Sequence, residues 1–123
     1  MTSNPVGWFE IYVQDMSRAK TFYESVFAAR LEKLESPGME MWTFPMQPEG
    51  RGAAGALVKM EGNPSGGNST VVYFMCDDCA VEAKRAAEKG GKIFKDKFSI
   101  GEHGFIALVT DTEGNMIGLH SMK

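Results

Sequence analysis

The segment VQDMSRAK (residues 13–20) ends a run of β-type residues and opens a run of helix-type residues, and CDDCAVEA (76–83) does the same 63 positions later. The ends of the two halves also correspond, because GALVKM (55–60) lies 62 positions before IGLHSM (117–122). A repeat of about 60 residues is longer than a solenoid unit. The sequence therefore predicts a duplicated half-domain, whose two copies bury their apolar faces together.

Length and composition bound the class of protein. A chain of 123 residues, with 43% hydrophobic and 24% charged residues, is typical of one globular domain with a sizeable core. A net charge of −3 offers no basic surface to a phosphate backbone, so we expect no nucleic-acid partner. No apolar run reaches the length of a membrane span, and the segment MTSNP (1–5) lacks signal-peptide regions. We expect a cytoplasmic protein with no membrane partner.

Each half predicts the order strand, helix, strand, strand, strand. In the first half, about 6–60, strand-type residues fill 6–13, 29–34, 39–46 and 53–60. Asp15 or Ser17 can cap a helix that runs to about residue 27, with a buried stripe of Ala19, Phe22, Tyr23 and Val26. A linker rich in glycine follows at 61–69. The second half, about 70–122, predicts strands at 70–76, 92–97, 104–110 and 115–121 and a helix from Asp78 to about Lys89.

The first strand carries two different sets of side chains, which a strand points to opposite faces. The set Phe9, Ile11 and Val13 is apolar and should pack on a helix, whereas Trp8, Glu10 and Tyr12 should face something else.

The two cysteines form a C-x-x-C motif, Cys76 to Cys79. One interpretation is a redox pair at a helix N-terminus. The other is structural, and the repeat favours it, because the matching positions are Val13 and Met16. The acids between the thiols would also raise their pKa. We expect both thiols to be reduced and dispensable.

The chain resembles the vicinal oxygen chelate superfamily, which includes glyoxalase I, extradiol dioxygenases, and bleomycin- and fosfomycin-resistance proteins. The resemblance is carried by the first strand at 8–13, by QDMSRAKTFY (14–23) and by DTEGNMIGL (111–119). It implies an α+β fold of two paired βαβββ modules with cupped mixed sheets, and residues 1–123 as a single domain. The resemblance, together with exposed strand edges, also implies a homodimer.

Metal-dependent relatives place ligands on four strands, at positions that fall here on Trp8, Ala56, Val71 and Gly118. None of these side chains is a metal ligand. The resemblance thus implies the fold without its chelate. We expect neither a metal nor another cofactor, and the metal-dependent lactoylglutathione lyase reaction is not expected.

Glu10 should share a face with Trp8, and His120 with Gly118. In the family geometry both would point into a cup between the modules. Three interpretations stay open: an acid/base pair, a relocated metal site, or a polar contact that lines a pocket. His103, in the segment 100–104, is expected to be a solvated turn residue.

An inner set of mostly aromatic residues either forms a second core or lines a small-molecule pocket, and consists of Trp8, Tyr12, Trp42, Phe44, Tyr73 and Met75. The leading prediction is a metal-free, glyoxalase/bleomycin-resistance-like protein that binds a small, partly apolar molecule in the cup. An isomerase or lyase that uses Glu10 and His120 is the alternative, and a structural or interaction module is the third possibility.

Overall fold

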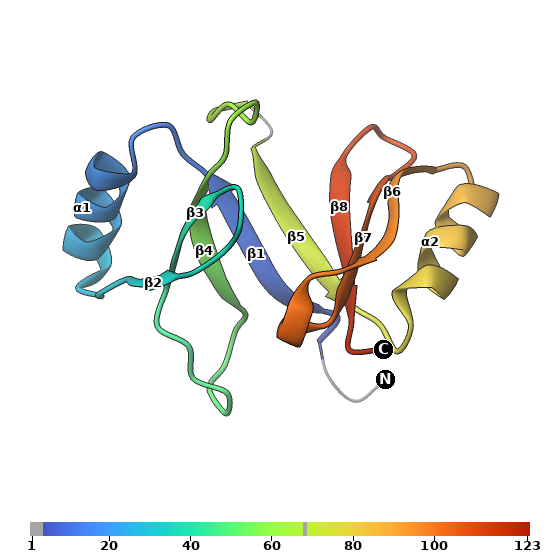
Figure 1. Ribbon diagram of the computed structural model, residues 1–123, viewed down its shortest axis with the longest axis horizontal. Coiled ribbons are helices and arrows are strands. Elements are labelled where there is room, and N and C mark those ends of the chain that lie inside the picture. Colours follow the sequence, from blue (N-terminus) through green and yellow to red (C-terminus); the bar gives the residue numbers. More distant parts are fainter. Residues whose placement is uncertain (1–3, 68) are drawn as a thin grey trace. The chain divides into compact units, whose positions relative to one another are not determined.

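The computed structural model describes residues 4–67 and 69–123, and its elements follow the βαβββ order twice (Figure 1). The first set is β1 (Val6–Tyr12), α1 (Met16–Phe27), β2 (Glu32–Leu34), β3 (Glu40–Thr43) and β4 (Ala54–Lys59). The second is β5 (Thr70–Met75), α2 (Cys79–Glu88), β6 (Lys92–Ser99), β7 (Phe105–Thr110) and β8 (Met116–Ser121). The predicted α+β fold of two βαβββ modules is confirmed. Two predictions fall partly on residues that the structure does not describe. Residues 1–3 belong to the segment 1–5, where we expected no signal peptide, and residue 68 belongs to the predicted linker.

The chain forms two compact units. One is Trp8–Thr70, and the other is Val71–Lys123 together with residues 4–7. The start of β1 belongs with the later unit, where the Met75 backbone N–H donates to the Pro5 carbonyl over 2.8 Å. Among the described residues, no helix combines the length and the hydropathy needed to cross a membrane.

In the Trp8–Thr70 unit, the strand order is β2-β3-β4-β1, with β1 and β4 parallel and the other pairs antiparallel. The helix α1 begins where sequence predicts, because the Asp15 Oδ1 accepts the Arg18 backbone N–H over 3.0 Å. It ends at Ala28, which adopts a left-handed φ of 51°. The core between α1 and the sheet consists of buried Val13, Met16, Leu31 and Leu57.

The predicted buried stripe of α1 is wrong in two positions. Phe22 and Val26 are 57% and 56% exposed, whereas Ala19 and Tyr23 pack against the core. The predicted stripe did not include Met16, which is buried and sets the direction of the face that α1 turns to the core. At 3.6 residues per turn, Phe22 then falls on the outer side of the helix, whereas Val26 lies close to the direction of Ala19 but in the last turn of α1.

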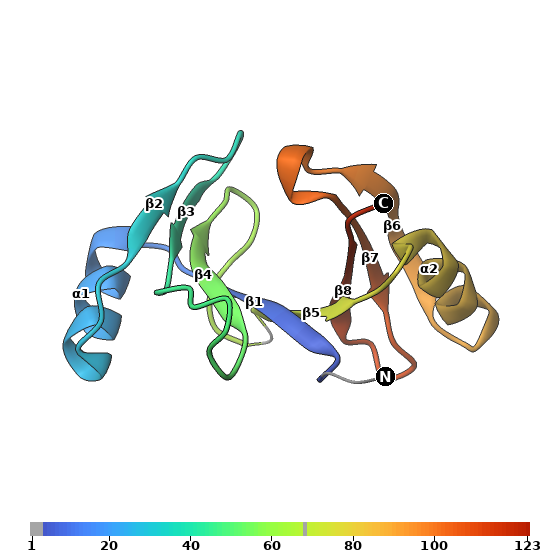
Figure 2. The same cartoon turned by 90° about the horizontal axis from the view of Figure 1, so that it is seen from below.

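In the later unit, the strand order is β5-β8-β7-β6, with β5 and β8 parallel. The helix α2 lies along β6 and β7 (Figure 2). Its buried residues Cys79 and Ala83 pack on Ala107, Val109 and Leu119.

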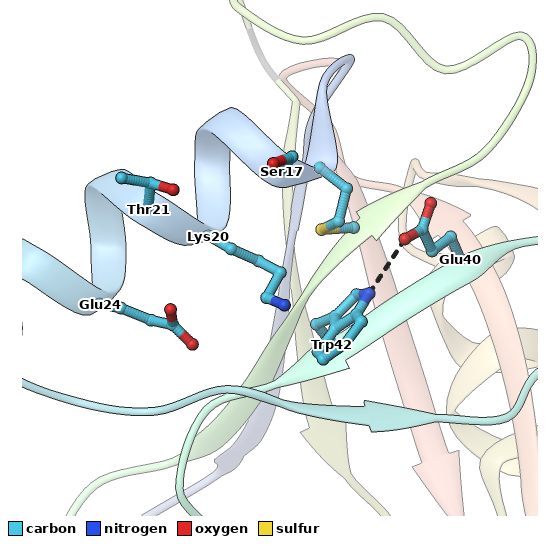
Figure 3. A pocket seen from close by; sticks show the side chains of 7 residues that line it. Ser17, Lys20, Thr21, Glu24, Glu40 and Trp42 are labelled. Atoms are coloured by element: carbon cyan, nitrogen blue, oxygen red, sulfur yellow. Dashed lines mark hydrogen bonds between the residues drawn. The ribbon is translucent and has the colours of Figure 1, made fainter.

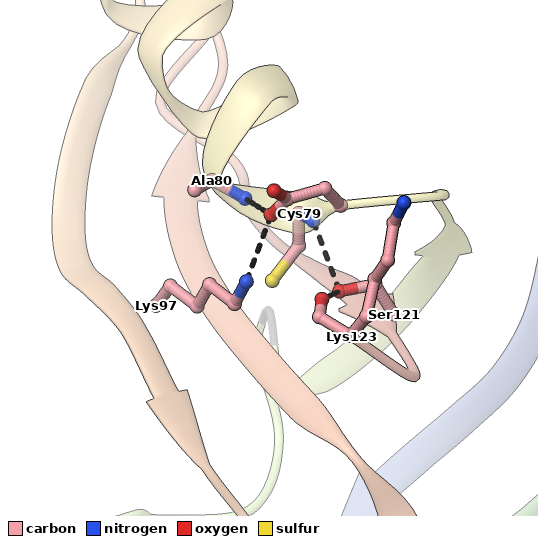
Figure 4. Close-up of polar contacts among 6 residues, drawn as sticks. Cys79, Ala80, Lys97, Ser121 and Lys123 are labelled. Carbon is pink, nitrogen blue, oxygen red and sulfur yellow. Dashed lines mark hydrogen bonds and ion pairs between the residues drawn. The ribbon is translucent and has the colours of Figure 1, made fainter.

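Hydrogen bonds fix the start of α2 to the end of β8 (Figure 4). The Cys79 backbone N–H donates to the Ser121 Oγ over 3.0 Å, and that hydroxyl donates to the Lys123 carbonyl over 2.8 Å. Asp78 caps the helix through the Ala80 N–H and pairs with the Lys97 Nζ at 2.9 Å. The buried cysteine is therefore part of a structural junction.

Both cysteines are free thiols, Cys79 fully buried and Cys76 half-buried. Burial, and then the carboxylate of Glu82, raise the pKa of Cys76 to about 11. The acid responsible is thus Glu82 on α2, and not the Asp77–Asp78 pair that the sequence suggested. The raised pKa is the opposite of what a redox thiolate requires.

Candidate functional site

A carboxylate held by two aromatic side chains lies at the centre of β1. The Glu10 Oε2 accepts the Trp8 indole N–H over 3.1 Å, and its Oε1 accepts the Tyr12 hydroxyl over 3.1 Å. Glu10 is only 9% exposed. The three residues alternate along one strand, so their predicted common face is confirmed.

The neighbouring strands surround this carboxylate with small and apolar groups. Ala56 on β4 lies opposite Glu10, Thr43 on β3 lies opposite Ala56, and both are buried. Burial, and then the negative charge of Glu10, raise the pKa of Tyr12 above its usual range. The phenol therefore stays protonated and remains a donor to the carboxylate.

In the later unit, Tyr73 and Met75 lie beside Gly118 and His120 on paired strands. The Tyr73 ring covers Gly118 so closely that a Cβ there would collide with the ring. Tyr73 is buried, whereas Met75 is 55% exposed. The predicted common face of Gly118 and His120 is confirmed by the register of β8.

The imidazole of His120 is oriented by a backbone carbonyl. Its Nε2 lies 2.6 Å from the carbonyl oxygen of His103. Because a carbonyl only accepts, the Nε2 carries a proton, and in the neutral ring the lone pair is on Nδ1. His103 lies in a short 3₁₀ helix, Gly101–His103, where sequence predicted a loop. His103 acts on His120 through its backbone carbonyl, so the identity of its side chain gives no indication of this contact.

The structure contradicts the predicted placement of Trp42 and Phe44 on the face of Trp8 and Tyr12. Both pack in the core beneath α1, and Phe44 contacts the rings of Phe9 and Tyr23 at centroid distances of 5.6 Å each. The cause is register: Trp42 lies opposite Leu57, which lies opposite Ile11, whose side chain faces the helix.

Sequence reasoning also missed a pocket between α1 and β3 (Figure 3). This Trp42 pocket has a volume of about 250 Å³ and is lined by Met16, Ser17, Lys20, Thr21, Glu24, Glu40 and Trp42. The sequence contains part of the information needed to find this pocket. Strand alternation puts Glu40 and Trp42 on one face of β3, and helical spacing puts Ser17, Lys20 and Glu24 on one face of α1.

A family model described as the Glyoxalase/Bleomycin resistance protein/Dioxygenase superfamily matches residues 6–119. The chain belongs to this superfamily. Among curated relatives, a provisionally named glyoxylase, CFP32, from Mycobacterium bovis and Mycobacterium tuberculosis, is 28% identical in an alignment 118 residues long that covers 92% of this chain. The aligned part is 44% of CFP32, so the chain spans less than half the length of these relatives.

Solved structures share the fold of this superfamily member at low sequence identity. The methylmalonyl-CoA epimerase of Mycobacterium tuberculosis is 14% identical, with a TM-score of 0.71 over 100% of this chain and 93% of that one. A Streptomyces coelicolor methylmalonyl-CoA epimerase in complex with 2-nitronate-propionyl-CoA is 15% identical, with a TM-score of 0.68 over 96% of each chain. At these identities the likeness concerns the fold alone.

The four residues that the resemblance aligned with metal ligands have no side chain that binds a divalent ion. Ala56 is fully buried, Gly118 lies under the Tyr73 ring, and neither Trp8 nor Val71 has a ligand atom for a divalent ion. Within the part of the chain that the structure describes, no three His, Cys, Asp or Glu residues are grouped to hold a metal.

Proposed function

We propose that the chain binds a small, partly apolar molecule on the face of β1 that carries Trp8, Glu10 and Tyr12. The observation that carries the proposal is the Glu10 carboxylate, 9% exposed and held by two aromatic donors. A charged group is costly to bury, even when it is hydrogen-bonded. Trp8 and Tyr12 supply apolar surface with polar ends, and such surfaces with a few fixed polar groups are typical of small-molecule sites.

In this proposal the ligand's polar end is oriented by Glu10 and by His120, and Tyr73 and Met75 add apolar contacts. The joint use of Glu10 and His120 is a prediction, since the residues belong to different units. Trp42 and Phe44 are left out because both face α1.

A thermal-shift screen of small amphipathic molecules, followed by calorimetry on the first hit, tests this function. Trp8→Ala removes a stacked aromatic, worth about 1 kcal/mol beyond its area. His120→Ala removes a polar partner, worth about 1–3 kcal/mol. Each should weaken binding by roughly five- to a hundredfold. The control is Phe22→Ala on the outer side of α1, which should leave the affinity unchanged. If Trp8→Ala and His120→Ala both bind as tightly as the parent, the site lies elsewhere.

A second candidate is proton transfer by an isomerase or lyase, favoured by two observations. Glu10 is a buried carboxylate, and the His120 Nδ1 carries a lone pair while its Nε2 is fixed by the His103 carbonyl. Each group can act as a base that takes the proton from a carbon next to a carbonyl, and its conjugate acid, the Glu10 carboxyl or the His120 imidazolium, then returns a proton to that carbon. Incubation of carbonyl compounds with the protein in D₂O, followed by NMR, would detect exchange of that proton. Exchange that persists in both Glu10→Gln and His120→Gln would refute this candidate.

A homodimer in the cytoplasm remains our expectation for the assembly. Sedimentation should give twice the chain mass of 13.5 kDa. A single species at the chain mass would contradict it.

A further inference from the structure

The Trp42 pocket brings an aromatic face and two carboxylates together on the α1 side of the sheet, and one cation already occupies that face. The Lys20 Nζ lies 3.3 Å from the centroid of the Trp42 ring. The indole N–H of Trp42 donates to the Glu40 Oε2 over 3.0 Å, which holds the ring in place. Figure 3 shows Lys20 reaching from α1 toward the ring, with Glu24 on the helix and Glu40 on the strand.

The charges of the lining favour a cation over an anion. Glu24 and Glu40 supply two negative charges against the single positive charge of Lys20. The face of an indole ring attracts ammonium groups and is the most effective aromatic surface for this purpose. Within the pocket lining, an anion would meet two carboxylates and the negative face of the ring, and only the Lys20 ammonium would favour it. Lys33, which lies opposite Trp42 on β2, is outside this lining.

We propose that the Trp42 pocket is a binding site for a small organic cation, an alkylammonium or quaternary ammonium group, and that the Lys20 ammonium occupies it in the free chain. Lys20 is then an internal competitor that a ligand must displace. The volume of about 250 Å³ suits such a group, because it lies below the range typical of pockets for drug-sized molecules.

This site is independent of the proposed function at Glu10. Trp42 packs in the core under α1, whereas Trp8 and Tyr12 pack with Met41, Ala56 and Val58 on the other face of the same sheet. A failure of either proposal therefore leaves the other untouched.

The two tryptophans of the chain allow a direct test by NMR. The ¹⁵N-labelled protein shows one indole N–H signal for each tryptophan, and Trp42→Phe identifies the signal of Trp42. Tetramethylammonium chloride should shift the Trp42 signal in a saturable manner and leave the Trp8 signal in place. Sodium chloride at equal ionic strength, and sodium acetate, should not reproduce the shift.

Variants of the lining decide whether Lys20 competes. Lys20→Met should tighten tetramethylammonium binding about three- to tenfold, because it frees the ring of an ammonium group. Glu24→Gln and Glu40→Gln should each weaken binding about two- to fivefold, the range for exposed charge pairs. Lys84→Met on α2 is the matched control and should change nothing. Lys20→Gln replaces Lys20→Met if the latter lowers the melting temperature.

Three results would overturn the proposal. The first is a Trp42 signal that sodium chloride moves as much as tetramethylammonium does. The second is a shift caused by acetate alone, which would mark Lys20 as an anion site. The third is a folded Lys20 variant that binds tetramethylammonium no more tightly than the parent.

Discussion

At the scale of single residues, Glu10 is set by its own strand. Side chains two positions apart on a strand point the same way, so Trp8 and Tyr12 flank Glu10 whatever the rest of the chain does. Their hydrogen bonds of 3.1 Å each follow from that spacing. What the strand alone does not provide is burial, which comes from Ala56 and the strands beyond it.

The pairing of Tyr12 with Glu10 predicts a specific loss of stability in alkali. Burial and the Glu10 charge raise the pKa of Tyr12 above 10.0, so the folded state holds the phenolic proton more tightly than the unfolded state. This contribution is fully present below pH 10 and is lost as the pH rises beyond it. Urea unfolding at pH 9, 10 and 11 should show a smaller decline for Tyr12→Phe than for the parent.

Tyr23→Phe is the matched control for this experiment, because Tyr23 packs on the α1 side of the sheet. Its decline should be larger than that of Tyr12→Phe, because it keeps the pairing of Tyr12 with Glu10. A decline of equal size in Tyr12→Phe would show that the Tyr12 proton is not held by the fold.

The Cys76 thiol provides a second prediction at this scale. Its pKa of about 11, against an ordinary 9.0, leaves roughly a hundredfold less thiolate at pH 8. In a Cys79→Ala background, alkylation by iodoacetamide should therefore be slow. Glu82→Gln should speed it, because the carboxylate raises the pKa, whereas Glu88→Gln on the exposed side of α2 should not. Alkylation at the rate of a free thiol would contradict this account.

At the scale of elements, the helix starts are local features. Asp78 is an N-cap in the structure, as predicted, and of the two predicted candidates Asp15 and Ser17 it is Asp15 that caps α1. Both could be found because a cap needs only a short acceptor before a helical run. Asp15→Ala should lower the free energy of unfolding by about 1 kcal/mol, since an N–H in the first turn loses its acceptor. Asp15→Asn keeps an acceptor and should lie within a few tenths of a kcal/mol of the parent in urea unfolding. Equal losses in the two variants would assign the effect to charge instead of capping.

The order of helices and strands could be predicted because their sequence patterns are also local. The sequence could not predict which side of the sheet each face of a strand meets. Alternation shows that Trp42 and Phe44 share a face, which is correct. Whether that face meets Trp8 or α1 depends on the register of β3 against β4 and β1, and a shift by one residue reverses the answer. The contact of His120 with the His103 carbonyl is likewise non-local, so no pattern in the sequence indicates it.

At the scale of the whole molecule, the repeat is preserved in the register of the strands. Glu10 pairs with Ala56 in one unit and Tyr73 pairs with Gly118 in the other, and these positions match at the offsets of 63 and 62 found in the sequence. Each copy thus places a large side chain beside a minimal one on parallel strands. The two copies have kept the backbone arrangement and have diverged in chemistry, a carboxylate in the first and a phenol ring in the second.

This divergence predicts that the purified protein carries less than one equivalent of Zn, Ni, Fe or Mn per chain. The four positions that the resemblance aligns with metal ligands hold Trp8, Ala56, Val71 and Gly118, none of which has a side-chain ligand atom for these ions. Gly118→Glu alone should not restore binding, because a Cβ at that position collides with the Tyr73 ring, and it should also destabilise the fold. Elemental analysis of the parent and of Gly118→Glu, each dialysed against the four metals, measures the outcome. One tight ion per chain in the parent would overturn the prediction, and Glu10→Ala and His120→Ala would then show whether the ion uses a relocated site.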